Sequence, residues 1–392
     1  MKIVLIPSGF KECLGAEDVA LAMDKGIRRV DPNADTVIIP MIDGGEGFAK
    51  TIVEIKKGRL VQTIATGPVG KKIMSHFGVY EEDGIVTAVI EMAAVAGLKL
   101  VPRHLRNPLV TTTYGIGELI KAALDLNVDR ILIGCGDSGT SDGGAGMAQA
   151  LGVRFLDQNH QTLEVNGGGD LCRVASVDLS RLDQRLQHVR IDAACNWHTP
   201  LCGTKGAAYI FGPQKGACPE DVELLATSFE RYAHLIQEAA GMDVRDMPGS
   251  GASGGLGAGL AAFAGAHLNP RYDIIMKYIN IEEHIRNADV VLTAEGCLDY
   301  QTPYGKIPAE VARIAKLSGV PVVAMTGTIG KGADINYTNG IDAYMSIIQK
   351  PATLEVAMEK AAVWIADCAE TTLRQMKIGY QIAERIYKRE LA

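Results

Sequence analysis

Short apolar runs alternate along the chain with polar, glycine-rich loops and with segments that repeat apolar residues at helical spacing. The first run is Lys2–Pro7, and a helical pattern follows from residue 16 to residue 30. A second run, Thr36–Pro40, leads into the loop Asp43–Gly47 and another helical segment. Because strand, loop and helix repeat in this order, the pattern predicts a sheet of parallel strands.

The same order returns near the end of the chain. Its apolar runs are Asp289–Thr293, Val320–Met325 and Ala343–Ile347, and a helical segment, Pro308–Ser318, separates the first two. Runs that are apolar throughout are typical of strands buried on both faces of a sheet. We therefore expect an α/β protein of two domains, in which both chain ends build one doubly wound, mostly parallel sheet.

The domain limits follow from where this pattern stops and resumes. We expect residues 1–80 and 285–392 to form a Rossmann-like α/β domain, with residues 81–284 as an inserted second α/β domain. The inserted domain should contain the strands Thr87–Glu91, Arg130–Gly134 and Val189–Ala194. Two domains in series along the chain are the alternative arrangement.

Composition narrows the class of protein. The 392 residues carry a net charge of −7 with scattered Lys and Arg residues, which argues against a nucleic-acid-binding face. Eight cysteines without a Cys-x-x-Cys pair indicate reduced thiols. No run reaches the roughly 18 apolar residues of a membrane span, and the first residues read as a strand rather than a signal peptide. We therefore expect a cytoplasmic protein that binds neither nucleic acid nor membrane.

The loop Gly134–Gly146 follows an apolar run and opens a helical segment. Its glycines let the backbone approach a ligand closely, and the N–H groups at a helix start bind anions such as phosphate. A tight turn capped by Asp142 is the alternative, although a turn needs far fewer glycines. The candidate phosphate- or nucleotide-binding residues are Gly136, Ser138, Thr140, Asp142, Gly143 and Gly144.

Acidic residues mark the loop Asp43–Gly47, which follows a strand at the edge of a parallel sheet where ligands bind. The carboxylates of Asp43 and Glu46 could hold Mg²⁺ or accept a substrate proton. Equally, they could cap the next helix.

Two other loops combine lysines with polar groups. The segment Thr293–Lys306 contains Glu295, Asp299 and Lys306, and Phe211–Ala217 contains Lys215. Phosphoryl transfer needs this mixture, because cations neutralise phosphate, carboxylates hold metal and polar donors orient the reactants. The sequence has no Walker-type phosphate loop, zinc-protease motif, nucleophile elbow or Cys/His cluster.

Taken together, these loops resemble the bacterial type-1 glycerate kinase family over essentially the whole chain. The resemblance implies a two-domain α/β enzyme that phosphorylates D-glycerate to 2-phosphoglycerate with ATP and Mg²⁺. The shared blocks are Phe10-Lys11-Glu12, Asp43–Gly47, Glu91–Ala94, Arg106–Leu109, Ser138 with Thr140, Asp142–Met147, Phe211–Ala217, Glu295-Gly296, Asp299 with Gln301, and Gly305-Lys306.

The chain also departs from the family pattern. Two acids and one arginine of the usual motifs are replaced here by Ser8, Asn196 and Cys297, and the large Trp197 follows Asn196. The glycine loops are intact, so the pattern indicates a retained phosphate apparatus with an altered acceptor pocket. As a hypothesis, turnover of D-glycerate should be poor or absent, whereas binding of a nucleotide or phosphate compound should survive.

We therefore predict a kinase that transfers the γ-phosphate of ATP, with Mg²⁺, to a hydroxyl group of D-glycerate or a related small hydroxy acid. Its partners would be this small molecule and the nucleotide, and assembly into a homo-oligomer is left open. One alternative is a diverged, non-catalytic paralogue that binds a phosphorylated metabolite or nucleotide. Another is an enzyme of a different class that reuses the phosphate site.

The predicted site residues should line one cleft between the two domains, because phosphoryl transfer gathers cations, metal ligands and donors around one phosphate. The predicted roles are catalysis by Lys11, Asp43 and Asp299; acceptor binding by Ser8, Asn196, Trp197, His198, Cys297 and Gln301; phosphate binding by the glycine-loop residues with Lys215 and Lys306; and metal binding by Asp43, Glu46 and Glu295.

Overall fold

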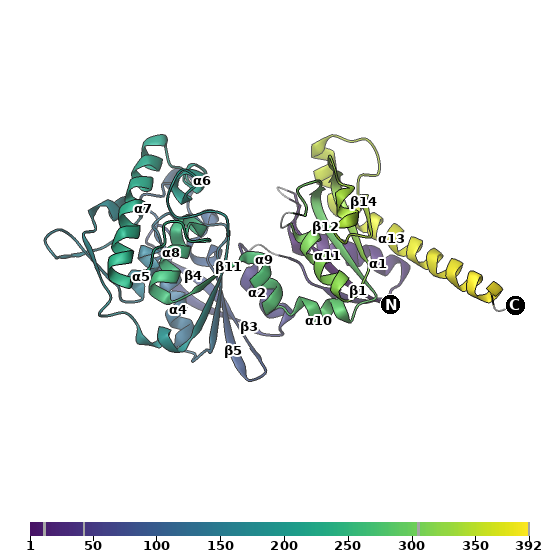
Figure 1. Ribbon diagram of the computed structural model, residues 1–392, viewed down its shortest axis with the longest axis horizontal. Helices are drawn as coiled ribbons and strands as arrows, with labels where there is room; N and C mark the ends of the chain where they lie inside the picture. Colours follow the sequence, from purple (N-terminus) through teal and green to yellow (C-terminus); the bar gives the residue numbers. More distant parts are fainter. Residues whose placement is uncertain (11–12, 42–43, 304–305, 391–392) are drawn as a thin grey trace. The chain divides into compact units, whose positions relative to one another are not determined.

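The computed structural model describes residues 1–10, 13–41, 44–303 and 306–390. The chain divides into two compact units: unit 1 comprises residues 1–42 and 280–392, and unit 2 comprises residues 43–279. Each unit has its own sheet and its own hydrophobic core (Figure 1). None of the helices in the described ranges is both long enough and apolar enough to cross a membrane.

Unit 1 is built on a five-stranded sheet. Its strands are β1 (Lys2–Pro7), β2 (Asp35–Ile38), β12 (Val290–Leu298), β13 (Val322–Ile329) and β14 (Ala343–Ser346). They lie in the order β14-β13-β12-β1-β2, and every neighbouring pair is parallel. The chain runs from β1 to β2 on one side and from β12 through β13 to β14 on the other. The sheet is therefore doubly wound, with its switch point between β1 and β12, and the parallel α/β fold expected for the chain ends is confirmed.

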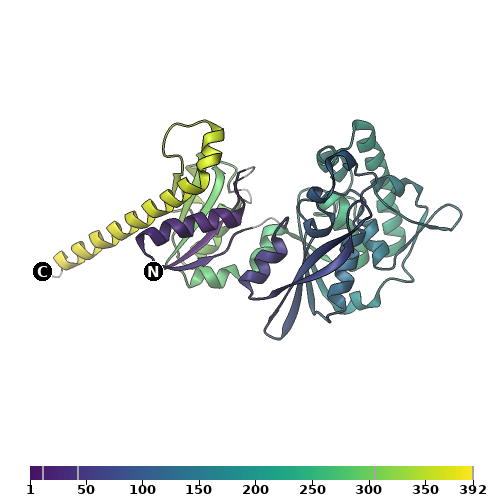
Figure 2. The same cartoon turned by 180° about the vertical axis from the view of Figure 1, so that it is seen from behind.

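Helices cover both faces of this sheet. They are α1 (Ala16–Val30), α10 (Ile281–Arg286), α11 (Ile307–Leu317), α12 (Ile335–Thr338) and α13 (Leu354–Glu390). Figures 1 and 2 show α11 on one face of the sheet and α1 with α13 on the other. The core beneath α1 and α13 contains alternate residues of the strands, because successive side chains of a strand point to opposite faces. The periodic apolar residues of α1 complete it.

Unit 2 contains a six-stranded sheet and a small three-stranded one. The large sheet has the order β11-β10-β6-β5-β4-β3; β3 with β4 and β4 with β5 pair antiparallel, and the other pairs are parallel. The strands are β3 (Arg59–Thr66), β4 (Lys72–Glu82), β5 (Ile85–Glu91), β6 (Arg130–Gly134), β10 (Arg190–Cys195) and β11 (His267–Pro270), with β7 (Arg154–Leu156), β8 (Thr162–Leu163) and β9 (Ser176–Asp178) in the small sheet.

The helices of unit 2 pack around the large sheet and against one another. One core cluster joins α4 and α8 to the strands, and a second joins α5, α6, α7 and the small sheet. The α-helices are α2 (Phe48–Ile55), α3 (Ala93–Ala96), α4 (Tyr114–Leu124), α5 (Ala145–Ala150), α6 (Ala207–Phe211), α7 (Pro219–Ala240), α8 (Ala252–Ala264) and α9 (Arg271–Tyr278); the 3₁₀ turns are η1 (Leu98–Leu100), η2 (Arg103–Leu105), η3 (Gly168–Arg173), η4 (Gln184–His188) and η5 (Pro213–Lys215).

The structure differs from the expected layout in two places. Strands β3 and β4 belong to the sheet of unit 2, whereas residues up to 80 were expected in the sheet of the chain ends. Strands β12 and β13 also continue past the expected strand ends, with Cys297 paired to Thr328 and Leu298 to Ile329. These polar segments were interpreted as loops, because the pairing of two strands with each other cannot be recognised from local composition.

Candidate active site

Unit 2 contains a cavity of about 650 Å³ at the carboxyl ends of three of its parallel strands. Glu91 ends β5, Gly136 follows β6, and Asn196 follows β10; all three line the cavity. Parallel strands end at one edge of a sheet, so residues distant in the sequence converge there. The charged and polar side chains around the cavity are Glu46, His76, Glu91, Lys99, Arg106, Asp137, Ser138, Asn196, Gln214, Ser253 and Arg271.

Two glycine loops singled out in the sequence cross at this cavity. A Cβ atom on Gly136 would lie 2.5 Å from the backbone nitrogen of Gly45, and one on Gly134 would lie 2.5 Å from the carbonyl oxygen of Gly44. Such distances exclude any side chain. The glycines therefore allow the backbones of residues 44–47 and 134–138 to touch.

Carboxylates hold these loops in place. Oε1 of Glu91 accepts a hydrogen bond from the Gly47 N–H at 3.1 Å, and Oε2 accepts one from the Ala49 N–H at 2.9 Å, so Glu91 caps α2. Burial raises the pKa of Glu91, although these two N–H groups act in the opposite direction. Asp137 accepts a hydrogen bond from the Glu46 N–H at 3.0 Å, and the Glu46 side chain forms an ion pair with Lys99.

Four predicted site residues line this cavity: Glu46, Gly136, Ser138 and Asn196. The two residues after Asn196, predicted to bind the acceptor with it, are not among the described lining residues. His198 is exposed, and its N–H donates to the Asn196 Oδ1 at 3.4 Å. Trp197 is partly buried, and its carbonyl oxygen accepts from the Gly249 N–H at 3.1 Å.

The second half of the long glycine loop lies inside unit 2. The Asp142 carboxylate is fully buried and accepts hydrogen bonds from the N–H groups of Thr113 at 2.7 Å, Gly144 at 3.1 Å and Gly146 at 3.2 Å. These contacts are the capping alternative that the sequence left open. A Cβ atom on Gly143 would lie 2.6 Å from the Tyr232 ring, and one on Gly144 would lie 3.0 Å from Gly259. Phosphate binding by these three residues stays a prediction.

Lys215 and Thr140 are buried beside Asp142. The Lys215 Nζ donates to the carbonyl oxygen of Thr140 at 2.5 Å and to the Ser141 Oγ at 3.4 Å. Burial lowers the pKa of Lys215 to about 7, although the nearby Asp142 charge opposes this shift. Lys215 is only 1% exposed, so its ammonium faces the protein interior in this structure.

Unit 1 gathers a second set of predicted residues at the carboxyl ends of β1 and β12. Ser8 follows β1, and its Oγ donates to the Ala294 carbonyl oxygen at 3.0 Å. The Lys306 Nζ donates to the carbonyl oxygen of Cys297 at 3.0 Å and to the Asp299 Oδ1 at 3.2 Å. This cluster lies beside the switch point of the sheet, where doubly wound folds bind their ligands.

The charges of this cluster are set by mutual contacts. Burial opposes ionisation of Asp299, but hydrogen bonds from Lys306 and from the Gln301 N–H outweigh it and lower the pKa of Asp299. The Cys297 Sγ lies 3.7 Å from the Asp299 Oδ2, and burial together with the Asp299 charge raises the pKa of this thiol. Asp299 therefore keeps its negative charge at neutral pH, and Cys297 stays protonated.

The predicted metal ligands are carboxylates, which fit Mg²⁺ by type. The described residues contain no group of three His, Cys, Asp or Glu side chains that could hold a metal ion. A nucleotide-bound Mg²⁺ needs only one or two protein carboxylates, since phosphates and water complete its shell. Glu46 could serve once its ion pair with Lys99 opens. Glu295, in unit 1, is partly buried.

Two predicted catalytic residues, Lys11 and Asp43, lie outside the described residues. The expected single cleft would combine residues of both units, such as Asp142 with Asp299. That convergence stays a prediction.

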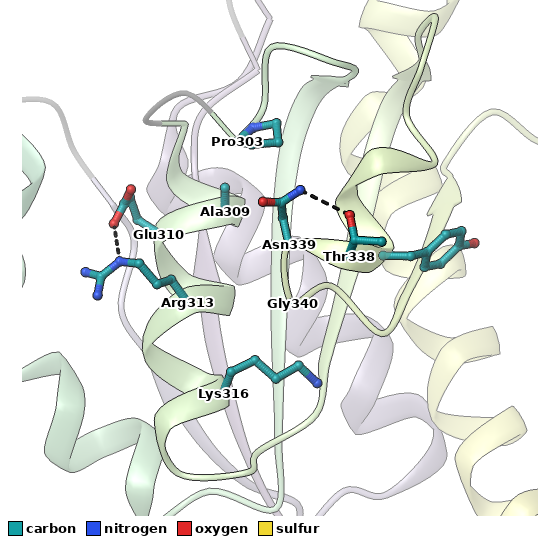
Figure 3. Close-up of a pocket in the computed structure, with 9 residues that line it drawn as sticks. Pro303, Ala309, Glu310, Arg313, Lys316, Thr338, Asn339 and Gly340 are labelled. Atoms are coloured by element: carbon teal, nitrogen blue, oxygen red, sulfur yellow. Dashed lines mark hydrogen bonds and ion pairs between the residues drawn. The ribbon is translucent and has the colours of Figure 1, made fainter.

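A cavity of about 430 Å³ in unit 1 contains none of the predicted site residues among its described lining (Figure 3). It lies along α11, the end of α12 and the two residues that follow α12. The Arg313 Nε is 3.0 Å from the Glu310 Oε2, and the Lys316 Nζ is 2.7 Å from the Asp342 Oδ1. Its cations are therefore already paired with acids.

Several cavity residues were missed by the sequence reasoning. Glu91, Arg106 and Gln214 stand in blocks shared with the resembled family, and that membership was the signal available for them. His76 and Lys99 stand in no such block and no motif marked them.

One unit has a doubly wound sheet with a charged carboxyl edge, and the other is an α/β unit with a polar cavity at the carboxyl edge of its own sheet. These features define a ligand-binding α/β protein. Comparison with known proteins identifies the family. The sequence model of the glycerate kinase family matches residues 3–377. The chain belongs to the glycerate kinase family, and it is a phosphotransferase with an alcohol group as acceptor.

The individual relatives match over nearly their whole length. The glycerate kinase of Bacillus subtilis (strain 168) is 42% identical over 387 residues, which cover 99% of this chain and 100% of that protein. The glycerate 2-kinase of Escherichia coli (strain K12) is 42% identical and covers 98% of this chain and 100% of its own length. A crystal structure of a protein assigned as glycerate kinase 2 from Salmonella typhimurium LT2 matches with a TM-score of 0.83 and 43% identity, over 97% of this chain and 99% of that chain. The family resemblance read from the loops is confirmed.

Proposed function

We propose that the protein transfers the γ-phosphate of ATP to a hydroxyl group of D-glycerate or a related small hydroxy acid. The observation that carries this proposal is the convergence of residues 44–47, residues 134–138 and Asn196 on one polar cavity. This convergence occurs in a chain whose relatives named glycerate kinase are 42% identical over nearly its full length. Mg²⁺ bound with ATP would neutralise phosphate charge during transfer.

Each unit supplies groups that such an enzyme needs. In unit 2, Ser138 and Asn196 supply neutral hydrogen-bonding groups to the cavity, which suits the hydroxyl groups of an acceptor. In unit 1, the Lys306 ammonium suits a phosphate group, and the ionised Asp299 carboxylate suits a metal ion or a proton. Lys11 and Asp43 remain the other proposed catalytic residues.

Release of ADP tests the proposal. The full chain is incubated with ATP, Mg²⁺ and, one at a time, D-glycerate, L-glycerate, glycolate and D-lactate. We expect at least one acid to give a turnover of roughly 1–100 s⁻¹ and a phosphorylated product identified by mass spectrometry. If no acid stimulates ADP release while calorimetry shows nucleotide binding, the protein is a non-catalytic member of its family.

The altered acceptor positions predict how well D-glycerate is used in comparison with the other acids of the panel. Ser8, Asn196 and Cys297 stand where the resembled family has two acids and an arginine, so D-glycerate is expected to be a poor acceptor relative to another acid of the panel. The variant carrying Ser8→Asp, Asn196→Asp and Cys297→Arg should then gain D-glycerate activity. Ordinary turnover of D-glycerate by the parent would show instead that these replacements are tolerated.

A further inference from the structure

Arg106 lines the cavity of unit 2 from the loop between η2 and α4. Its Nε–H is buried and has no hydrogen-bond acceptor among the residues that the structure describes. Leaving a buried donor unsatisfied is unfavourable, and more so for a charged group. A guanidinium cannot escape this cost by losing its proton, because it stays charged at every physiological pH. Arg106 therefore lines the cavity and has a donor that the described residues leave unpaired.

The backbone of Arg106 is held from two sides. A Cβ atom on Gly216, which has a φ of 98°, would lie 2.2 Å from the Arg106 carbonyl oxygen, so this glycine turn packs directly on the Arg106 backbone. The next residue, Asn107, accepts a hydrogen bond from the Leu109 N–H at 2.8 Å through its side chain. The guanidinium is therefore attached to a fixed loop, which reduces the entropy lost when it binds a ligand.

The other charged groups at the cavity are engaged elsewhere. Lys99 pairs with Glu46, and the Arg271 guanidinium lies over the Tyr272 ring at 4.7 Å. The carboxylates of Glu91 and Asp137 accept hydrogen bonds from loop N–H groups. No carboxylate among the described residues is paired with Arg106, so its charge remains for a ligand.

The remaining polar groups indicate what that ligand is. Ser138, Asn196 and Gln214 offer a hydroxyl and two amides to the same cavity. A small hydroxy acid carries one carboxylate and one or two hydroxyl groups, and a guanidinium binds a carboxylate through two parallel hydrogen bonds. We infer that this cavity is the acceptor pocket and that Arg106 anchors the carboxylate of the acceptor acid. The inference rests on the proposed function. It places a guanidinium in the cavity of unit 2, whereas in unit 1 Cys297 stands where the resembled family has an arginine.

Replacing the guanidinium tests this assignment. Arg106→Gln should lower kcat/KM for the hydroxy acid that the parent phosphorylates fastest by about 10- to 100-fold, as expected for a lost charge-assisted hydrogen-bonded pair. Its KM for ATP should change less than threefold. Arg106→Lys keeps the charge but lacks the planar guanidinium, so its kcat/KM for the acid should lie between those of the parent and of Arg106→Gln. Arg103→Gln is the matched control, since Arg103 is exposed and lies outside the described lining of the cavity.

Glycerol separates recognition of the carboxylate from a general loss of activity. It lacks the acid group, so the ratio of the rate with the acid to the rate with glycerol should fall in Arg106→Gln. A decrease of threefold or less in kcat/KM for the acid would overturn the assignment. A rise in the KM for ATP instead would also overturn it, because Arg106 would then bind phosphate.

A measurement on the unmodified chain keeps the inference testable if the variants do not fold. Phenylglyoxal reacts selectively with arginine, and peptide mass spectrometry reports its attachment to Arg106. At least one acid of the panel (D-glycerate, L-glycerate, glycolate or D-lactate) should protect Arg106 from modification, and glycerol should not. Equal modification with all four acids and with glycerol would contradict the inference. Failure of the proposed function is a separate result, namely no phosphoryl transfer from the parent to any acid, and the protection experiment does not depend on it.

Discussion

Lys215 combines a charged group with an almost fully buried position. It lies 1% exposed against Thr140, Ser141 and Asp142, and burial lowers its pKa to about 7. The unfolded chain would hold the same ammonium protonated up to about pH 10.4. Folding therefore releases a proton from Lys215 between pH 7 and about pH 10.4.

The sign of the resulting pH dependence follows directly. The unfolded state binds more protons in this window, so the contribution of Lys215 to the free energy of unfolding rises with pH, by at most about 1.4 kcal/mol per pH unit. Below pH 7 both states hold the proton, and the contribution is constant. We expect the difference in free energy of unfolding between the parent and Lys215→Met to change with this slope in urea titrations at pH 6.5, 7.5, 8.5 and 9.5.

Taking the difference between two chains cancels the other groups that titrate in the same range, such as the buried cysteines with raised pKa values. Lys205→Met is the control, because Lys205 is exposed. Its difference from the parent should be flat across the same pH range. Equal slopes for the parent and Lys215→Met would mean that Lys215 is not desolvated in solution.

Helix α13 changes character along its length. Its first half is part of the core of unit 1, where Trp364 is 5% exposed and Ile365 is fully buried. Residues 377–389 are all exposed, and Figure 2 shows this end of the helix running past the sheet of unit 1. Isolated helical turns are marginal in water, so the terminal half gains its helical form mainly by continuing the packed half.

Removal of residues 377–392 should therefore cost little. It deletes no buried side chain among the described residues. The ion pair that it breaks with the part of unit 1 that remains, between Lys377 and Asp31, is worth at most about 1 kcal/mol. We expect the free energy of unfolding to fall by about 1 kcal/mol or less. Trp364→Ala, in the packed half of the same helix, should cost about 3–5 kcal/mol. A large loss on truncation would show that the terminal half has a partner in solution.

At the scale of the whole molecule, the prediction concerns which part of the chain folds alone. Unit 2 contains the strands β3 and β4, and Phe77 of β4 is 1% exposed in its core. The fragment 43–279 keeps these strands, whereas the fragment 81–284, the limits expected from the sequence, lacks β3 and nearly all of β4. We expect 43–279 to unfold cooperatively on heating and 81–284 to lack that transition in circular dichroism.

Comparing the thermal unfolding of the two fragments tests the domain boundary. The shorter one would expose the edge of β5 and uncover apolar residues that β4 now buries, which favours aggregation. A cooperative transition in 81–284 alone would support the boundary near residue 80 and contradict our expectation for the longer fragment.

Features that depend on residues close together in the chain could be predicted from the amino-acid sequence. The strand Lys2–Pro7 and the helix Ala16–Val30 were predicted with the limits that the structure has, because burial on both faces and helical periodicity are written in consecutive residues. The glycine loops and their order likewise identified the family before any coordinate was considered. Positions where backbones touch, such as Gly136, keep a recognisable residue type because no side chain fits there.

Which of these residues share a site became visible only in the folded chain. Asp142 and Ser138 stand four positions apart in one loop, yet the first is a buried cap and the second lines the cavity. Arg106 looks like any surface arginine in the sequence, but the fold buries its Nε without an acceptor among the described residues. The reason is physical: burial, pairing and pKa depend on neighbours that the chain brings together from distant positions. Local composition carries no record of those neighbours.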